Sequence, residues 1–149
     1  MRYLIENNIL KRYIVDSEED VDCPVAIIPN GVELIGGNMT DDDRKKCEEY
    51  SDDDPLFYQA FRNNKMIRFV YIPDSVKTIG AKSFEHCSNI NRVRFPRSLE
   101  GVSEFADKDI LDAFYGGSVE EFKHNKNNQW CKNCRVIHCS DGDVAGDQL

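Results

Sequence analysis

The sequence predicts a mainly β protein with short helical turns, in which similar units stack as a solenoid. The first observation is a repeated motif: residues 70–80 read VYIPDSVKTIG, residues 26–36 read AIIPNGVELIG, and residues 93–102 carry a weaker copy, VRFPRSLEGV. The second is a constant spacing, because Pro73 and Pro96 lie 23 residues apart. A period of this length is typical of solenoids, in which each unit buries its apolar face only against its neighbours.

Apolar residues alternate within each copy, and this alternation predicts which side chains face the core. Ahead of the proline, the predicted inward residues are Val70, Ile72, Val93 and Phe95. After it they are Val32, Ile35, Val76, Ile79, Leu99 and Val102, while Phe61 and Phe84 fill the helical side. Gly36 and Gly80 suit positions that need a positive φ or close packing.

The spacing between the first two copies exceeds the period, which predicts an insertion. Pro29 and Pro73 lie 44 residues apart, so 21 extra residues fall between about positions 37 and 58. This stretch carries eight acidic and three basic residues. Thr40 and Asp43 have the spacing of a capping box, so we expect a short helix to begin there and the insertion to project from the solenoid.

Composition and charge exclude several classes of function. The chain has 149 residues, 40% hydrophobic and 31% charged, which suits one globular domain. The net charge of −8 argues against direct binding to nucleic acid or to an anionic membrane. No apolar run reaches the roughly 20 residues that span a bilayer. A secretory signal needs an apolar stretch of about 7–15 residues near its start, and the acidic Glu6 interrupts the apolar residues here, so we expect a cytoplasmic protein.

Several segments resemble one known family. Residues 72–90 read IPDSVKTIGAKSFEHCSNI and closely resemble the BspA-like leucine-rich repeats of bacterial and protozoan proteins. Residues 114–122 are similar to the tyrosine-glycine-glycine segment that closes such arrays, and residues 136–142 to their final strand. Residues 3–10 resemble the hairpin that often precedes the first repeat.

Together with the insertion, the resemblance implies a short leucine-rich-repeat solenoid with an N-terminal hairpin, one inserted acidic helical segment and a C-terminal β cap. Members of the family are mostly non-catalytic and present a surface for binding proteins or cell surfaces, so the resemblance implies a protein-protein interaction module. We expect a single domain, residues 1–149, made of a hairpin cap (1–24), a first repeat (25–36), the acidic insertion (37–58), further repeats (59–106) and a C-terminal cap (107–149).

The outward side chains of the repeat strands are the first candidate binding site. Alternation places one row of residues at Ile27, Tyr71 and Arg94, and the next row at Val25, Phe69 and Arg92. Aromatic and arginine side chains are typical anchors of protein interfaces, so we select Phe69, Tyr71, Arg92 and Arg94. The alternative is that Phe69 and Tyr71 pack beneath the insertion or a loop and complete the core.

Acidic side chains in the insertion are the second candidate contact. They are Asp41, Asp42, Asp43, Glu48, Glu49, Asp52, Asp53 and Asp54. Such a surface can imitate a phosphate backbone, which suggests an alternative function: an inhibitor of a nucleic-acid-handling protein complex, as in anti-CRISPR proteins encoded by phages or mobile elements. The plainer interpretation is a solvated face that keeps the solenoid in solution.

Six cysteines are present, and without a secretory context we expect them to be reduced. Cys131 and Cys134 form a Cys-x2-Cys pair, a spacing that can supply two zinc ligands, with His138 as a further candidate. A zinc-stabilised structural module is therefore a second alternative, although the ligand set is incomplete and we expect no cofactor. No nucleophile elbow and no glycine-rich phosphate loop is present, so we do not expect an enzyme.

Overall fold

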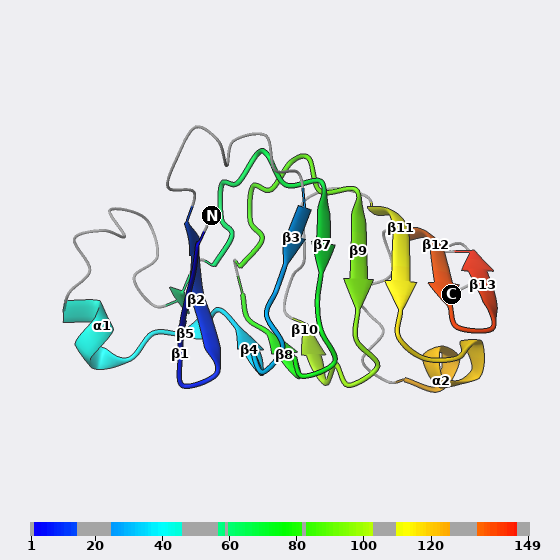
Figure 1. Cartoon of the computed structure of the whole chain (residues 1–149), viewed down its shortest axis with the longest axis horizontal. Helices are drawn as coiled ribbons and strands as arrows, with labels where there is room; N and C mark the ends of the chain where they lie inside the picture. Colours follow the sequence, from blue (N-terminus) through cyan, green and yellow to red (C-terminus); the bar gives the residue numbers. More distant parts are fainter. Residues whose placement is uncertain are drawn as a thin grey trace.

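Short strands recur along the chain and stack into two large sheets, beside a separate two-stranded pair (Figure 1). The computed structural model describes residues 2–14, 25–45, 57–58, 60–81, 83–102, 110–125 and 134–145, and the structural statements below concern these residues. One sheet contains, in spatial order, β13 (Gly142–Ala145), β12 (Cys134–Cys139), β11 (Ile110–Tyr115), β9 (Arg92–Phe95), β7 (Phe69–Tyr71) and β3 (Val25–Ile27). The other contains β1 (Arg2–Glu6), β2 (Ile9–Ile14), β4 (Leu34–Ile35), β8 (Thr78–Ile79) and β10 (Gly101–Val102). The predicted mainly β solenoid is confirmed.

The six-stranded sheet is parallel from β3 to β12, and β13 then pairs with β12 in the antiparallel direction. The pairing aligns the repeats in register: Ile27 lies opposite Tyr71, and Tyr71 lies opposite Arg94. The residues immediately before these, Ala26, Val70 and Val93, also lie opposite one another, and their side chains point into the core. The predicted alignment of the copies is therefore confirmed, and equivalent side chains stack from coil to coil.

The five-stranded sheet begins with an antiparallel hairpin formed by β1 and β2. Asn7 and Asn8 make its turn with positive φ angles of 54° and 63°, a conformation that asparagine tolerates better than most residues. Strands β2, β4, β8 and β10 then pair in parallel. The hairpin thus covers one end of the repeat array (Figure 1).

The core contains the residues that alternation predicts. Val70, Ile72, Val93 and Phe95 are buried, and so are the residues after the proline turn, Val32, Ile35, Val76, Ile79 and Leu99. The side chain of Val102 lies outside the described part. Phe61 and Phe84 are buried and stack with ring centroids 4.8 Å apart. Each such side chain contributes about 1.5–3 kcal/mol to the free energy of folding when it leaves water, so these buried side chains together supply much of the stability of the fold.

The proline turns have the same hydrogen bonds in each copy. The carbonyl oxygen of Pro29 accepts from the amide of Val32, and the same bond recurs at Pro73 and at Pro96. Serine side chains then join neighbouring turns: Ser75 donates to the Val32 carbonyl (2.8 Å), and Ser98 donates to the Val76 carbonyl (3.0 Å). The coils are therefore linked by side chains as well as by the strand ladders.

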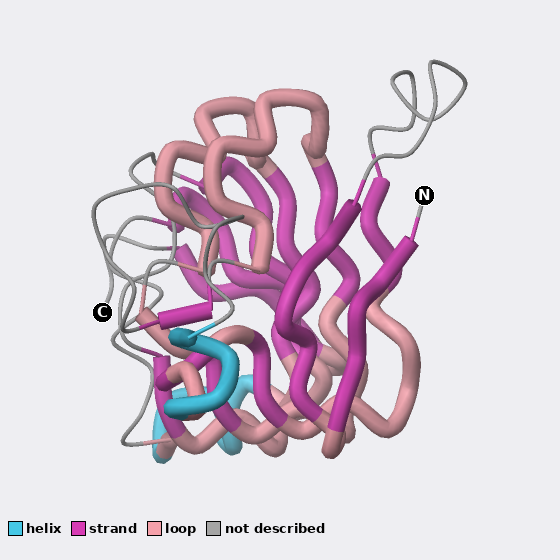
Figure 2. The backbone as a smooth tube through the Cα atoms, turned by 90° about the vertical axis from the view of Figure 1, so that its left-hand side faces the viewer, coloured by secondary structure: helices cyan, strands magenta, loops and turns pink. Residues whose placement is uncertain are grey.

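The acidic insertion leaves and re-enters the solenoid through adjacent strands. β5 (Gly37–Asn38) pairs antiparallel with β6 (Phe57–Tyr58), so the two ends of the insertion lie side by side. Helix α1 (Asp41–Lys45) follows β5, and the Thr40 hydroxyl accepts from the Asp43 amide at 3.2 Å, as the capping pattern predicts. Figure 2, viewed along the stacking direction, shows α1 in front of the repeat strands.

The C-terminal part adds β11, helix α2 (Val119–His124) and the β12–β13 hairpin. Ser118 caps α2, since its hydroxyl accepts from the Glu121 amide at 3.1 Å. Phe122 of this helix is fully buried and packs edge-on against Tyr115, with ring centroids 5.4 Å apart. Within the described ranges, no helix has the length and apolar composition needed to cross a membrane.

Candidate functional site

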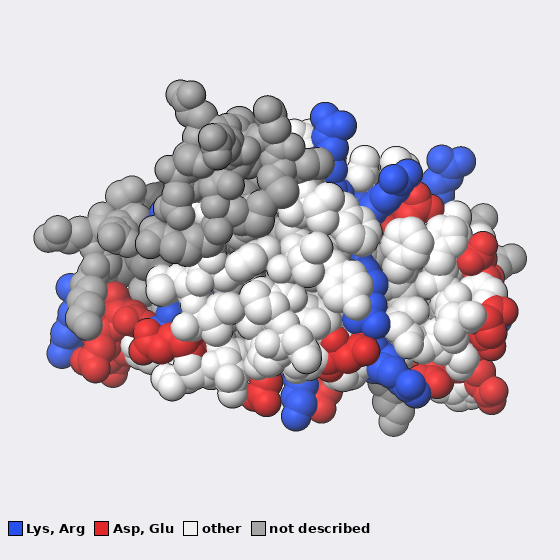
Figure 3. Space-filling view, viewed as in Figure 1, with Lys and Arg blue, Asp and Glu red and all other residues white. Residues whose placement is uncertain are grey.

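The outward face of the six-stranded sheet carries two continuous rows of side chains. The first row holds Ile27, Tyr71, Arg94, Phe114 and His138. The second holds Val25, Phe69, Arg92, Asp112 and Val136. Ile27 is 61% exposed, Tyr71 38% and Phe114 37%. Figure 3 shows uncharged side chains gathered over β3 and β7 and a line of basic side chains over β9.

Arg94 is held by contacts within its own sheet and turns. Its Nη1 donates to the Ile72 carbonyl at 2.8 Å, and its Nη2 lies 2.9 Å from Asp74 Oδ1. The guanidinium carbon also lies 5.0 Å from the centroid of the Tyr71 ring, a cation–π arrangement. A contact between Arg94 and a partner stays a prediction, and in the structure the guanidinium is already engaged with Tyr71, Asp74 and the backbone.

Phe69 and Arg92 also have neighbours on this face. Phe69 is half-buried, and its ring meets Phe114 edge-on with centroids 6.4 Å apart. Arg92 is exposed and its Nε lies 3.3 Å from Asp112 Oδ2. Phe69 on β7 thus packs against another outward aromatic residue, Phe114 on β11, across the intervening strand β9.

A carboxylate–imidazole–carboxylate arrangement, which no sequence motif indicates, lies at the end of the first row. His138 Nε2 lies 2.9 Å from Asp112 Oδ1, and His138 Nδ1 lies 2.9 Å from Asp143 Oδ1. The imidazole stacks on Phe114 with centroids 4.9 Å apart. The hydrogen bond to Asp112 raises the pKa of His138 although partial burial opposes it, and the same bond lowers the pKa of Asp112.

Two of the three proposed zinc ligands, Cys134 and His138, lie apart in the structure. Cys134 is buried at the start of β12, and His138 lies four residues further along the strand, about 13 Å away at the usual rise per residue. Cys131 lies outside the described residues. In the parts of the chain that the structure describes, no group of three or more histidine, cysteine and acidic residues is arranged to hold a metal ion.

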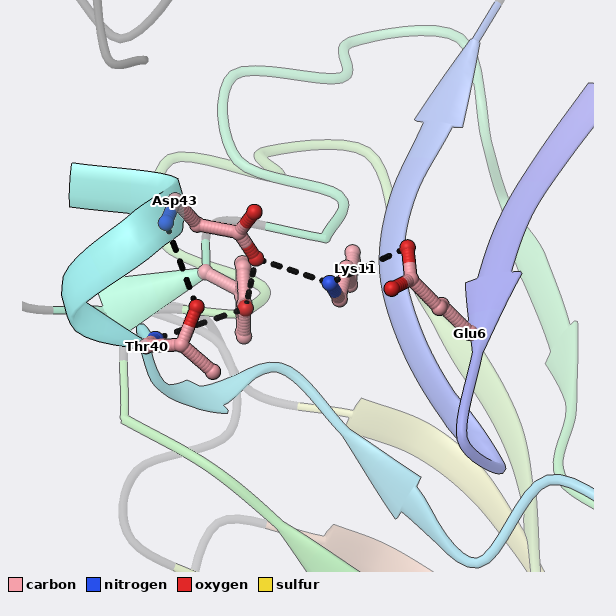
Figure 4. A network of polar contacts seen from close by, with 5 residues as sticks. Glu6, Lys11, Thr40 and Asp43 are labelled. Atoms are coloured by element: carbon pink, nitrogen blue, oxygen red, sulfur yellow. Dashed lines mark hydrogen bonds and ion pairs between the residues drawn. The ribbon is translucent and has the colours of Figure 1, made fainter. Parts of the chain in front are cut away.

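The acidic residues of the insertion have different environments. Asp41 and Asp42 are exposed on α1. The sequence places Asp43 on the same open acidic surface, but its carboxylate accepts from Lys11 Nζ at 2.7 Å and from the Tyr58 hydroxyl (Figure 4). The other predicted acids lie outside the described residues: Glu48, Glu49, Asp52, Asp53 and Asp54.

Lys11 connects the insertion to the N-terminal hairpin. Its side chain is only 8% exposed, with Nζ 3.4 Å from Glu6 Oε2 and 5.0 Å from the Tyr58 ring centroid. Burial lowers the pKa of Lys11, but hydrogen bonds to Asp43 and Tyr58 outweigh it and the pKa is raised overall. The bond to Lys11 is in turn the main reason that the pKa of Asp43 is lowered. We call Lys11, Asp43 and Tyr58 the latch.

Comparison with known proteins gives one match. The family model described as "BspA type Leucine rich repeat region (6 copies)" matches residues 56–133, slightly more than half of the chain. No curated protein and no solved structure matches the chain.

Proposed function

Because the chain belongs to the BspA-type leucine-rich repeat family, we propose that it is a non-catalytic protein-interaction module that binds its partner with the outward face of the six-stranded sheet. The family is typically non-catalytic, and repeat domains of this kind generally mediate protein interactions. The observation that carries the proposal is the row of exposed apolar side chains in register, Ile27, Tyr71 and Phe114.

Side chains on this face are held in fixed conformations, and this supports a role in binding. An aromatic anchor contributes most when its conformation is already set, because less side-chain entropy is then lost on association. Tyr71 lies under the Arg94 guanidinium, which is itself tied to Asp74 and to the backbone. Arg94 thus acts as a positioning residue, and Tyr71 and Phe114 provide the contact area. Arg92 is exposed and contacts Asp112 through its Nε, which leaves its terminal N–H groups to meet an acidic group of the partner.

The acidic end of α1 supports a second candidate, an inhibitor that imitates phosphates and blocks a nucleic-acid-handling protein complex. Asp41 and Asp42 are exposed, and the latch fixes the helix that carries them. A fixed acidic pair is better suited to electrostatic recognition than a free one, because its charges keep their spacing. In the first candidate, the same acids make a secondary contact.

A capture experiment with matched variants separates the two. The tagged chain is incubated with lysate of its source cell at low and high salt, and retained proteins are quantified by mass spectrometry. We expect Tyr71→Ala to reduce retention of the main partner about 30-fold, the loss typical of an interface anchor. Leu4→Ser is the control, because Leu4 is a similarly exposed apolar residue on the other sheet, 44% exposed.

The outcomes point in opposite directions. Binding by the outward face is supported if the partner is retained at high salt and by the double variant Asp41→Lys with Asp42→Lys, but is lost from Tyr71→Ala. Retention that is released by salt and lost only in the charge-reversed variant supports the acidic inhibitor. Equal losses for Tyr71→Ala and Leu4→Ser would contradict the proposed surface.

A further inference from the structure

His138 lies at the junction of three strands at the C-terminal end of the sheet. The imidazole belongs to β12, its Nε2 faces Asp112 on β11, and its Nδ1 faces Asp143 on β13, each at 2.9 Å. β13 is the last strand of this sheet and pairs only with β12 among the described strands. One side chain therefore links the edge strand to the interior of the sheet.

The two contacts together require an imidazolium ion. A neutral imidazole has one N–H donor and one lone pair, whereas both carboxylates at this site are acceptors. Loss of the proton leaves one carboxylate facing a lone pair, and that contact becomes unfavourable. Asp112 also has Arg92 at 3.3 Å, while the Asp143 side chain is 63% exposed and can turn toward water.

We propose that Asp112, His138 and Asp143 form a proton-operated clamp that secures β13 to the sheet and opens as the pH rises. Among the described residues, the charged neighbours of the clamp include Arg92, which faces Asp112 from β9, and Asp141 in the β12–β13 turn, whose carboxylate accepts from the Val119 amide. The Cys139 thiol on β12 is a further titratable neighbour, and burial, together with the Asp141 and Asp143 carboxylates, raises its pKa. The shifted pKa values of His138 and Asp112 agree with the geometry.

Opening affects the edge strand without disturbing the core. Val144 of β13 is buried in the hydrophobic core independently of the clamp, so the expected change is increased opening of the β13 ladder rather than unfolding. The same change alters the outward face, because the imidazole that stacks on Phe114 loses its charge and one of its two anchors. This consequence for partner binding rests on the proposed function, but the clamp itself does not.

Two measurements on the isolated chain test the clamp. Nuclear magnetic resonance of the histidine ring nitrogens across pH 5–9 reports the protonation of His138, and amide hydrogen exchange of β13 reports its opening. We expect both ring nitrogens to remain protonated above pH 6.5, the ordinary midpoint for histidine. Exchange of the β13 amides, corrected for base catalysis, then accelerates several-fold as His138 loses its proton.

Variants distinguish the clamp from a general effect of pH. In His138→Gln, β13 exchange is expected to be fast at pH 6 already and to show no step. His124→Gln removes an exposed histidine of α2 and should leave the step unchanged. A His138 titration at or below pH 6.5, or a step that persists in His138→Gln, would overturn the proposal. Ring titration and β13 exchange of the unmodified chain test the clamp even if a variant does not fold: a raised titration midpoint without faster β13 exchange would also overturn the proposal. Neither readout depends on a binding partner.

Discussion

At the scale of single residues, the most informative side chains are charged groups that the fold uses internally. Arg94, Asp43 and His138 are residue types that often recognise partners at protein surfaces. Here each one instead contacts a charged residue of another strand or turn: Asp74, Lys11 and Asp112, respectively. A charged group held in this way defines the position of its neighbours. Its removal is therefore expected to act on structure first and on recognition second.

The latch gives a direct test at this scale. Lys11→Met removes the cation from a site in which the Asp43 side chain is only 27% exposed, so that this carboxylate keeps the Tyr58 hydroxyl but loses its charged partner there. We expect a loss of about 1–3 kcal/mol in the free energy of unfolding, measured by urea denaturation. Lys45→Met on the exposed side of α1 is the control and should change stability by less than about 0.5 kcal/mol.

A double-mutant cycle shows whether the loss belongs to this pair. Asp43→Asn alone should destabilise the chain by a similar amount, and Lys11→Met with Asp43→Asn together should cost clearly less than the two single losses combined. Additive losses would mean that Lys11 and Asp43 stabilise the fold independently.

At the scale of the repeating element, stability depends on how closely the backbones of adjacent repeats can pack. The glycine that ends the repeat motif is expected to serve either a positive φ or close packing. Gly36 adopts a positive φ of 71°, which agrees with the first of these roles. Gly80 acts differently: a Cβ at this position would lie 2.2 Å from the Gly37 backbone nitrogen and 2.6 Å from the Gly37 Cα. The glycine thus allows the second repeat to approach the start of the insertion.

This close approach predicts a large effect of a small change. Gly80→Ala places a methyl group against backbone that cannot move without shifting β5, so we expect destabilisation of about 2 kcal/mol or more in urea unfolding. Gly142→Ala is the matched control, because its Cβ would meet nothing nearer than Val119 Cγ2 at 3.5 Å. Equal stability of the two variants would refute the packing argument.

At the scale of the whole molecule, three of the described groups with shifted pKa values, His138, Asp43 and Asp112, make stability depend on pH in the acidic to neutral range. The pKa of His138 is raised in the folded chain, so its contribution is complete below about pH 6.5 and is lost as the pH rises through the folded value. The pKa values of Asp43 and Asp112 are lowered, so their contributions are complete above about pH 3.9 and are lost as the pH falls.

The combined contribution of these groups is therefore greatest between about pH 4 and pH 6.5. Urea unfolding at pH 3, 5.5 and 9 should give the highest stability at pH 5.5. His138→Gln should remove much of the decline from pH 5.5 to 9, and Asp43→Asn part of the decline toward pH 3. A pH profile that His138→Gln leaves unchanged would show that the imidazole does not contribute.

Much of the fold is predictable because the repeats are local patterns. The alternation around Val70 and Ile72 identifies the buried side of the strands, and the matched motifs alone place Ile27, Tyr71 and Arg94 in one row. The excess spacing locates the insertion, whose ends pair as β5 and β6. Phe114 and His138 cannot be assigned to the row in this way, because no proline turn follows β11 or β12 to align them with the earlier copies.

The sequence alone determined the repeat, its inward and outward sides and the position of the insertion, since periodicity and alternation act over a few residues. Only the tertiary structure decided how the polar side chains are used. Lys11 meets Asp43 across 32 positions in the chain, and His138 meets Asp112 across 26. Such partners are selected by the register between coils and by burial, which no short stretch of sequence encodes.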